Sequence, residues 1–252
     1  MKTAIVKINA VRSINYRTDA SYHLSEGQNV QRSIAASPYP LIKVKEVASD
    51  IFIGNRAKRV YVKDIKHGIP FLSSSDILKA DLDNVKLASK KYTPEIERMS
   101  LKKGWTLISR SGTIGNCAFA NAKHAQKLAS EDVIRLVPNN ILRGGLVYAY
   151  LASKYGHSLL TQGTFGAVIQ HIEPAFVGSI AIPKFPESFQ HEVDDLIQEA
   201  ARLREEAADA MEEAKGKMRR FVNYSFIKKF YKTGWVSSKD ICNSLQHRLD
   251  PP

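Results

Sequence analysis

The feature that most limits how this chain can fold is a long segment, residues 187–223, with apolar residues at heptad spacing. These positions, called the seam below, are Val193, Leu196, Ala200, Leu203, Ala207, Ala210, Ala214 and Phe221. Charged residues flank the seam and prolines precede it, which is typical of one helix of roughly 45–50 Å. Small alanine side chains let two helix backbones approach closely, so the seam predicts pairing with another helix. The pattern leaves open a helix that lies on its own domain.

Charge divides the chain into two parts of opposite sign. The sequence carries 37 Lys and Arg against 25 Asp and Glu, a net charge of +12. Residues 190–217 hold nine acids and four bases, a charge of −5, so the remainder carries +17. A strongly basic body predicts a polyanionic partner such as nucleic acid. A domain with a lysine-rich solvated face would have the same composition.

The sequence lacks the residue patterns typical of metal-binding, disulfide-bonded and membrane-spanning proteins. Cys117 and Cys242 lie 125 residues apart, and the seven histidines form no HxxH or HExxH pattern, so we expect no metal site. Two unpaired thiols fit a reduced, cytoplasmic compartment. No window approaches the roughly 18 uninterrupted apolar residues of a membrane span.

Residues 38–182 are predicted to form a mixed body. The β-rich runs, separated by Gly, Pro, Asn and Ser, are YPLIKVKEVA, WTLISRSG, NCAFANA and SEDVIRLVP. Residues 144–163 have helical periodicity, and SIAIPKFP is expected to be a final buried strand ending at Pro183. The expected fold class is therefore α+β, a globular domain with short β-strands followed by a long coiled-coil-type α-helix.

The most distinctive short motif is GWTLISRSGTIGNCAFA, residues 104–120, where Gly112 and Gly115 lie between two strand-like runs. It lacks the Gly-Lys-Ser/Thr of a P-loop and the third glycine of a dinucleotide fingerprint. An RNA-clamping GxxG loop joins two helices, whereas these flanks look extended. Local chemistry alone predicts a hairpin turn in which Gly112 or Gly115 supplies a positive φ.

Longer stretches resemble one known family. LISRSGTIGNCAFA resembles a motif found late in the target recognition domains of type I restriction-modification specificity (S) subunits. QGTFGAVIQHIEPAFVGSIAIPKFPESFQHEV resembles the segment that closes that domain, and the seam-bearing helix resembles the family's central conserved region. The start of the chain also resembles its end: SINYRTDASY from Ser13 matches SLQHRLDPP from Ser244 at an offset of 231. Family members carry R-x-D, as here, at the entrance to each recognition domain.

The resemblance covers nearly the whole chain and implies three parts. These are a target recognition domain at 1–186, a conserved spacer and dimerisation helix at 187–223, and the truncated start of a second recognition domain at 224–252. Complete family members hold two recognition domains and two long helices, so we expect a fragment or a half-subunit.

The implied function is sequence-specific recognition of one half of a bipartite double-stranded DNA target. The implied partners, besides DNA, are methyltransferase (modification) subunits docked on the long helix, the restriction subunit through them, and a second recognition domain or a second copy of the chain. The sequence has no NPPY or NPPF motif, no FxGxG loop and no PD-(D/E)xK cluster, so we expect no catalysis and no cofactor. The alternative is a helix-mediated assembly protein whose basic face binds RNA or an acidic partner.

DNA recognition needs cations for phosphates and planar or amide side chains for base edges. The phosphate candidates are Arg56, Lys58, Arg59, Lys63, Lys90, Lys91, Lys102 and Lys103. The base-reading candidates are Arg110, Thr113, Gln162, Thr164 and Gln170. The candidate turn-forming residues are Gly112, Gly115, Gly163 and Gly166. Each side chain could instead be a surface charge or a turn hydrogen bond, and Arg110 could be the structural partner of Glu131 or Asp132.

Overall fold

A computed structural model of the chain describes residue 3 and residues 5–13, 16, 18–56, 58–164 and 170–222. Contacts between Cα atoms divide the chain into two units, Met1–Ala208 and Asp209–Pro252. The expected second recognition domain at 224–252 and most of the internal repeat lie outside the described residues, as does Gly166.

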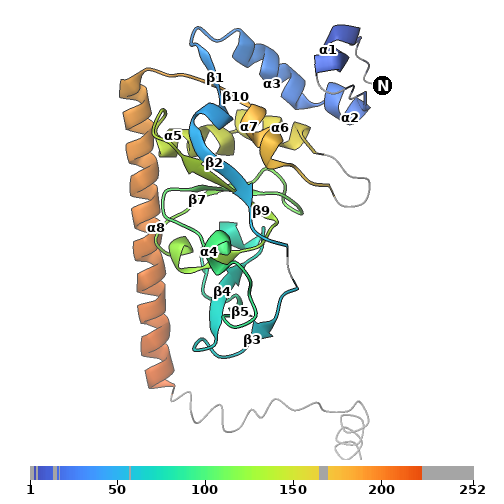
Figure 1. The fold of residues 1–252 in the computed structure, drawn as a ribbon. Helices are drawn as coiled ribbons and strands as arrows, with labels where there is room; N and C mark the ends of the chain where they lie inside the picture. The colour runs from blue at the N-terminus through green and yellow to red at the C-terminus, as the bar shows by residue number, and fades with distance from the viewer. Residues whose placement is uncertain are drawn as a thin grey trace, which may run out of the picture. The chain divides into compact units, whose positions relative to one another are not determined.

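A four-stranded antiparallel sheet lies at the centre of the first unit, with the strand order β2-β9-β6-β7 (Figure 1). Its strands are β2 (Ala48–Ile53), β9 (Val133–Pro138), β6 (Thr106–Ser109) and β7 (Cys117–Phe119). Ile108 of β6 pairs with Cys117 on one side and with Ile134 on the other. All four residues of β6 are buried, because both faces of this sheet are covered.

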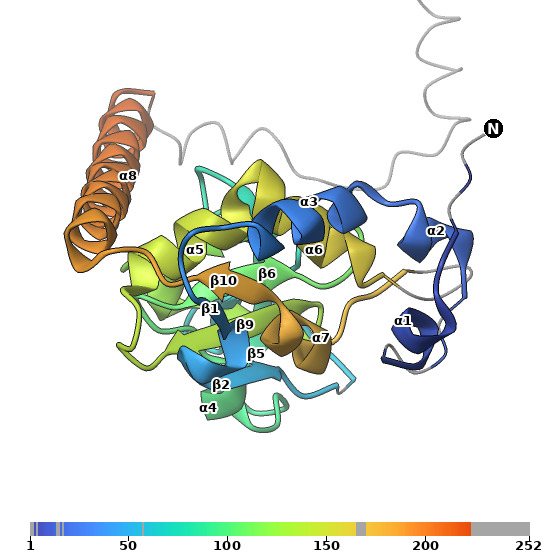
Figure 2. The ribbon, with the colours of Figure 1, turned by 90° about the horizontal axis from the view of Figure 1, so that it is seen from above.

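Helices cover one face of the central sheet (Figure 2). They are α3 (Glu26–Ala35), α5 (Gly144–Ala152), α6 (Lys154–Gln162) and α7 (Pro174–Ser179). The core on this side includes Val30, Ile34, Ile108, Ile134, Leu136, Val147, Leu151, Leu160, Ile172 and Val177. A two-stranded pair, β1 (Leu41–Lys43) and β10 (Ala181–Pro183), lies beside α3 (Figure 1). The chain begins with two short helices, α1 (Ile8–Ser13) and α2 (Ala20–His23), and Asp19 caps α2 by accepting a hydrogen bond from the amide of Tyr22.

A second sheet, with the order β3-β5-β4-β8, covers the other face of the central sheet. Its strands are β3 (Tyr61–Val62), β5 (Lys86–Ser89), β4 (Gly68–Leu72) and β8 (Leu128–Ala129), and the short helix α4 (Ile96–Met99) packs beside β8. The core on this side includes Leu72, Ile77, Leu101, Leu107, Ala118 and Val133. Leu107 and its neighbour Ile108 thus point into different cores, which explains the continuous apolar sequence of β6.

The predicted α+β class is confirmed, with two local differences. The sequence analysis did not identify strands β2 to β5 or β8. The helix expected at 144–163 is two helices that meet at Ser153, whose hydroxyl accepts a hydrogen bond from the amide of Gly156 at 3.2 Å and begins α6. A Cβ at Gly156 would lie 2.2 Å from the carbonyl oxygen of Tyr150, so the two helices pack tightly at this bend.

The long helix α8 runs from Glu187 to Phe221, 35 residues, or about 50 Å. Residues of α8 up to Ala208 belong to the first unit, and one face of them contacts that unit. Asp194 Oδ1 accepts a hydrogen bond from the amide of Gly145 at 2.6 Å, and Glu205 Oε1 accepts one from the amide of Ala122 at 2.7 Å. Ala201, between them on this face, is 2% exposed. The sequence left open that the helix lies on its own domain. This is what one face of α8 does.

The seam occupies a different face of α8. Leu196 and Leu203 are 64% and 50% exposed. Ala207, Ala210, Ala214 and Phe221 are also exposed, and only Val193 and Ala200 are partly buried. Since successive helix residues are about 100° apart, the seam lies roughly a third of a turn from the row Gln190, Asp194, Ala201 and Glu205. Contact with its own domain therefore leaves the seam of α8 uncovered.

Candidate nucleic-acid interface

The loop between β6 and β7, residues 110–116, is a tight hairpin end. Both Gly112 and Gly115 have positive φ, +75° and +81°. The amide of Ser109 donates to the carbonyl of Asn116 at 2.8 Å, and the amide of Gly115 donates to the carbonyl of Ser109 at 3.0 Å. The hydroxyl groups of Ser109 and Thr113 lie 2.9 Å apart. These bonds fix the loop, here called the glycine loop, with both Gly112 and Thr113 exposed.

The two glycines have different surroundings. A Cβ at Gly115 would lie 3.2 Å from Thr161 Cγ2 of α6, whereas the nearest described atom to a Cβ at Gly112 is Ser74 Oγ, 3.9 Å away. The absence of a side chain at Gly115 therefore lets the loop pack closely against α6, whereas the backbone of Gly112 is exposed at the surface.

Arg110, the first residue of the glycine loop, is only 9% exposed. Its Nη2 donates to Glu173 Oε1 at 2.5 Å, and its Nη1 lies 3.9 Å from Asp132 Oδ1. Its amide donates to the carbonyl of Asp132 at 2.8 Å, and its carbonyl accepts from the amide of Ile172 at 3.2 Å. Arg110 therefore ties together three segments inside the protein, and its guanidinium has the structural partners, Asp132 and Glu173, that the alternative interpretation requires.

The remaining base-reading candidates lie at the end of α6 and after it. Gln162 is 3% exposed, and its Oε1 accepts a hydrogen bond from Gln31 Nε2 at 3.1 Å. Thr164 is partly buried and Gln170 is exposed. Gly163 ends α6 with φ −76°, so it is not a left-handed turn residue. A Cβ there would lie 2.0 Å from the Phe176 ring, so close packing accounts for this glycine.

The connection between β8 and β9, residues 130–132, links the glycine loop to the loop between β2 and β3. Asp132 contacts Arg110, and the preceding residue, Glu131, forms an ion pair with Arg59. Arg56 Nε lies 4.0 Å from Glu131 Oε1, and its side chain is 78% exposed. The structure thus brings Arg56, Arg59 and the glycine loop to the same edge of the first unit.

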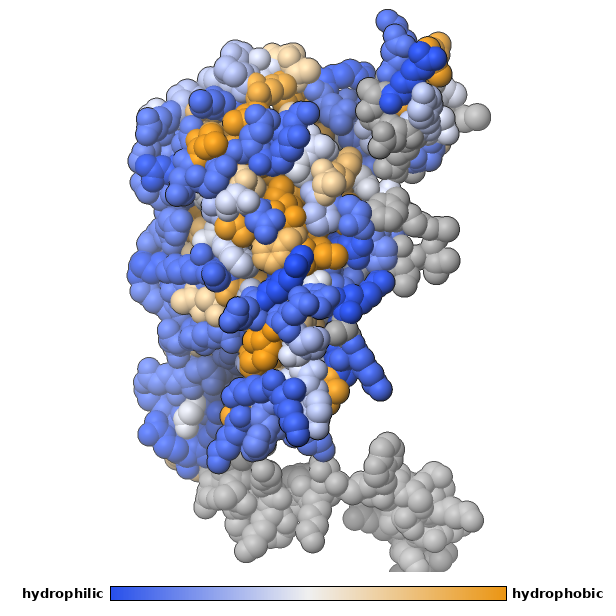
Figure 3. All heavy atoms as spheres, in the orientation of Figure 1, coloured by the Kyte–Doolittle hydropathy of each residue, from blue (hydrophilic) through white to orange (hydrophobic). Residues whose placement is uncertain are grey.

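The exposed lysine candidates lie on the second sheet and its loops. They are Lys58, Lys63, Lys90 and Lys91. Lys90 Nζ donates to the carbonyl of Lys66 at 3.1 Å, and Lys91 Nζ lies 5.3 Å from the centre of the Tyr92 ring. Residues 56–103 contain twelve bases and six acids, half of the net charge of the chain. The face in Figure 3 is predominantly hydrophilic, with small hydrophobic areas between.

Two other candidates lie elsewhere. Lys102 and Lys103 precede β6, at the end of that strand opposite the glycine loop. Lys102 Nζ lies 5.9 Å from the centre of the Trp105 ring, and Lys103 Nζ lies 3.5 Å from Glu205 Oε1 of α8. The structure therefore places Lys103 beside α8 and groups neither lysine with the glycine loop.

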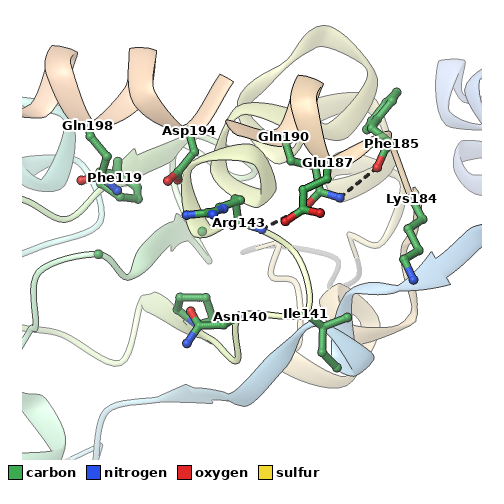
Figure 4. A pocket seen from close by; sticks show the side chains of 13 residues that line it. Phe119, Asn140, Ile141, Arg143, Lys184, Phe185, Glu187, Gln190, Asp194 and Gln198 are labelled. Carbon is green, nitrogen blue, oxygen red and sulfur yellow. Dashed lines mark hydrogen bonds between the residues drawn. The ribbon is translucent and has the colours of Figure 1, made fainter. Parts of the chain in front are cut away.

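A cavity of about 740 Å³ lies between the start of α8 and the loop before α5 (Figure 4). Gln190 of α8 spans its edge, because its Oε1 accepts from the amide of Arg143 at 3.4 Å and its Nε2 donates to the carbonyl of Phe185 at 2.8 Å. The Arg143 guanidinium contacts His191 at 2.6 Å. None of the predicted site residues that the structure describes lines this cavity, and its polar contacts serve to attach α8.

The sequence analysis missed Arg135 and named Glu131 only as a possible partner of Arg110, whereas Glu131 pairs with Arg59. Arg135 is fully buried, and its guanidinium donates to the backbone carbonyls of Met99, Ala129, Ser130 and Val133. Burial lowers its pKa to about 10. A charge inside the apolar run VIRLV was a usable signal for Arg135, but no local pattern marks Glu131.

Other chemistry can be surveyed over the described residues only. Among them, no group of three or more His, Cys, Asp and Glu side chains is placed to hold a metal ion. None of their helices is long and apolar enough to cross a membrane. Cys117 is buried, and burial raises the pKa of its thiol to about 12.

Comparison with known proteins gives matches among solved structures alone. No known family profile matches the chain, and no curated protein matches it. A chain from a type I restriction-modification system, studied for its complex assembly and conformational transition, is 16% identical with a TM-score of 0.49, over 89% of this chain and 56% of that one. The HsdS subunit of Thermoanaerobacter tengcongensis is 17% identical with a TM-score of 0.49, over 80% and 49%. The type I S subunit from M. genitalium is 13% identical with a TM-score of 0.41, over 64% and 38%.

The chain thus spans about half the length of the first two of these structures. These structural neighbours come from type I restriction-modification systems, and two of them are specificity subunits, the family that the sequence motifs also resemble.

Proposed function

We propose that this chain is a specificity component of a type I restriction-modification enzyme, which reads one half of a bipartite double-stranded DNA target. The observation that carries the proposal is the arrangement within the first unit. Basic loops gather around the glycine loop, while α8 contacts the unit through one face and leaves its seam exposed. One part of the molecule thus suits DNA and another suits a protein partner.

The basic loops have the chemistry of a DNA-binding surface. Exposed lysines such as Lys58 and Lys63 suit phosphate contacts, which fix position on the duplex without reading sequence. Thr113 and Gln170 are exposed near the glycine loop and can hydrogen-bond to base edges. The exposed backbone at Gly112 allows close approach, because glycine has no side chain in the way.

The length of α8 suits a bipartite target. Half-sites in successive major grooves lie about 34–36 Å apart, and a helix of about 50 Å can hold two recognition domains at that spacing. In this proposal the seam pairs with the equivalent helix of a second recognition domain or a second copy of the chain. Modification subunits dock on the paired helices, and the restriction subunit joins through them. The chain itself transfers no methyl group, and methyl transfer that scaled with its concentration would contradict this.

Duplex binding at several salt concentrations tests the proposal. The wild-type chain should bind a randomised pool of duplex DNA, enrich one short motif, and keep that preference as rising salt weakens all binding. Binding without enrichment that vanishes at moderate salt would contradict the proposal. It would favour an assembly protein with a generic basic surface, and a preference for RNA over duplex DNA would do the same.

A further inference from the structure

We infer that Glu131 is a positioning residue that orients Arg56 and Arg59 toward base edges, and that these two arginines read guanine in the target. The inference rests on the proposed function. The sequence suggested Arg110 for base reading and Arg56 and Arg59 for phosphate contacts. The inference reverses these roles, because Arg110 is buried while Arg56 and Arg59 reach the surface.

Glu131 sits on a rigid support. It is 9% exposed and lies in the short connection between β8 and β9. The amide of Ser130 donates to the carbonyl of Leu72 at 3.0 Å, and Arg135 Nη1 donates to the carbonyl of Ser130 at 2.9 Å. On the other side, the carbonyl of Asp132 accepts from the amide of Arg110 at 2.8 Å. The backbone on both sides of Glu131 is therefore fixed and its side chain is buried, so the arginines take their orientation from the carboxylate.

Arg59 is held by a second contact. Its guanidinium lies 5.1 Å from the centre of the Phe71 ring, and Phe71 is 4% exposed. Tyr61 packs edge-on against the same ring at 6.1 Å. The plane of the Arg59 guanidinium is thus set by a buried ring and a buried carboxylate, while its side chain remains 32% exposed. Arg56, 78% exposed, shares the carboxylate.

This arrangement suits base reading better than phosphate binding. Phosphate contacts depend mainly on charge, and one carboxylate shared by two guanidinium groups leaves a charge of +1 where two free arginines would carry +2. The exposed lysines nearby serve phosphates better. Reading a base instead needs a planar fork of donors in a fixed orientation, because guanine offers two acceptors, O6 and N7, on its major-groove edge. An arginine already held in place loses less conformational freedom on binding.

The test is selection of bound sequences from a randomised duplex pool with this chain and its variants. The wild type should enrich a motif that contains guanine. Glu131→Gln keeps the size of the side chain and removes its charge. It should bind the unselected pool at least as tightly as the wild type and lose about 10-fold or more of the preference for guanine at one or two positions. Glu131→Asp should retain part of the preference.

A matched control separates orientation from charge. Glu97→Gln removes the same charge from an exposed position in α4. It should tighten binding to the unselected pool and leave the enriched motif unchanged. A guanine preference lost equally in this control would overturn the inference.

Arg59→Lys and Arg56→Lys keep the charge and remove the planar fork, and they decide the question if Glu131→Gln fails to fold. Each should lose guanine preference while pool affinity holds. If the wild type selects a motif and all these variants keep its guanines, the inference fails and the proposed function stands. If folded Arg59→Lys loses binding to every duplex, Arg59 is a phosphate anchor and the inference also fails. If the wild type selects no motif, the proposed function itself fails.

Discussion

Gly104 and Gly115 have the same backbone conformation in different surroundings. Their φ values are +85° and +81°. A Cβ at Gly104 would meet no described atom within 4 Å, whereas one at Gly115 would press on Thr161 at 3.2 Å. Gly104→Ala should therefore lower the free energy of unfolding by about 1 kcal/mol, the strain of a left-handed residue. Gly115→Ala should lower it by about 1 kcal/mol more, because α6 must shift. Equal urea midpoints for the two variants would show that the packing of the glycine loop against α6 does not contribute to stability.

His124 should make stability depend on pH. It is 6% exposed, with Nε2 3.1 Å from the carbonyl of Ile77. Burial lowers its pKa below the ordinary value, and the charges of Lys127 and Arg204 lower it further. As pH falls through about 6.5, the unfolded chain takes up a proton that the folded protein does not. The stability from the neutral ring is therefore complete above that pH and is lost below it.

The check is urea unfolding of the wild type and of His124→Gln at several pH values between 7 and 5.5. The wild type should lose stability as pH falls, and the variant, which is less stable at pH 7, should lose less across the same interval. A slope in the variant as steep as in the wild type would assign the pH dependence to other groups.

At the residue scale, sequence alone could not rank the arginines. Arg59 and Arg110 each stand in a polar loop after an apolar run. What separates them is their partners, Glu131 for Arg59 and Asp132 with Glu173 for Arg110. These acids lie far from their arginines in the chain, so only the packed fold decides which guanidinium is buried. The glycines were easier to interpret, because a glycine between two strand runs already predicts a turn.

At the scale of elements, α8 is attached to the first unit partly by a side chain that caps the N-terminus of α5. Arg143, at the N-cap of α5, makes no side-chain capping bond within the described part of the chain, and Asp194 of α8 accepts from the amide of Gly145 instead, at 2.6 Å. Asp194→Ala should lower the free energy of unfolding by about 1 kcal/mol, the usual effect of losing a cap. It should also speed hydrogen exchange at the Gly145 amide.

Asp195→Ala is the matched control, since Asp195 is exposed and carries the same charge one position later on α8. It should leave both the stability and the exchange rate near those of the wild type. Equal losses in the two variants would mean that charge on α8 matters and the cap does not.

The elements differed in how well their sequences predicted them. Helix α8 was predictable because its pattern persists over many turns, yet periodicity alone could not tell which partner its faces meet. Strands β6, β7 and β9 lie in apolar runs because they are covered on both sides. Strand β3, with two residues, and β5, whose four residues run from exposed to buried without alternation, give too short a signal. Ser153 was misleading, since a serine inside an apparent helix can either face solvent or cap a new helix.

At the scale of the whole molecule, an acidic helix is carried by a basic chain. Within the first unit some of the opposite charges meet, as in Lys103 with Glu205, but most acids of α8 are exposed or paired along the helix, as in Arg202 with Glu199. Exposed pairs of this kind contribute little to stability. Under the proposed function their main effect is therefore on partners, because negative charge would keep α8 away from phosphates and leave DNA to the basic loops.

The two faces of α8 give the last prediction. Ala201→Arg would force a long cation into the contact with the first unit and should lower the free energy of unfolding by about 3 kcal/mol. Leu203→Arg and Ala207→Arg place the same side chain on the exposed seam, so unfolding should change by less than about 0.5 kcal/mol. If the seam pairs with another helix, these two variants should still lose association with a second copy or with the modification subunits in sedimentation, because a charged side chain keeps the backbones apart. Association as strong as in the wild type would mean that the seam has no part in assembly, and any partner would then have to bind another face.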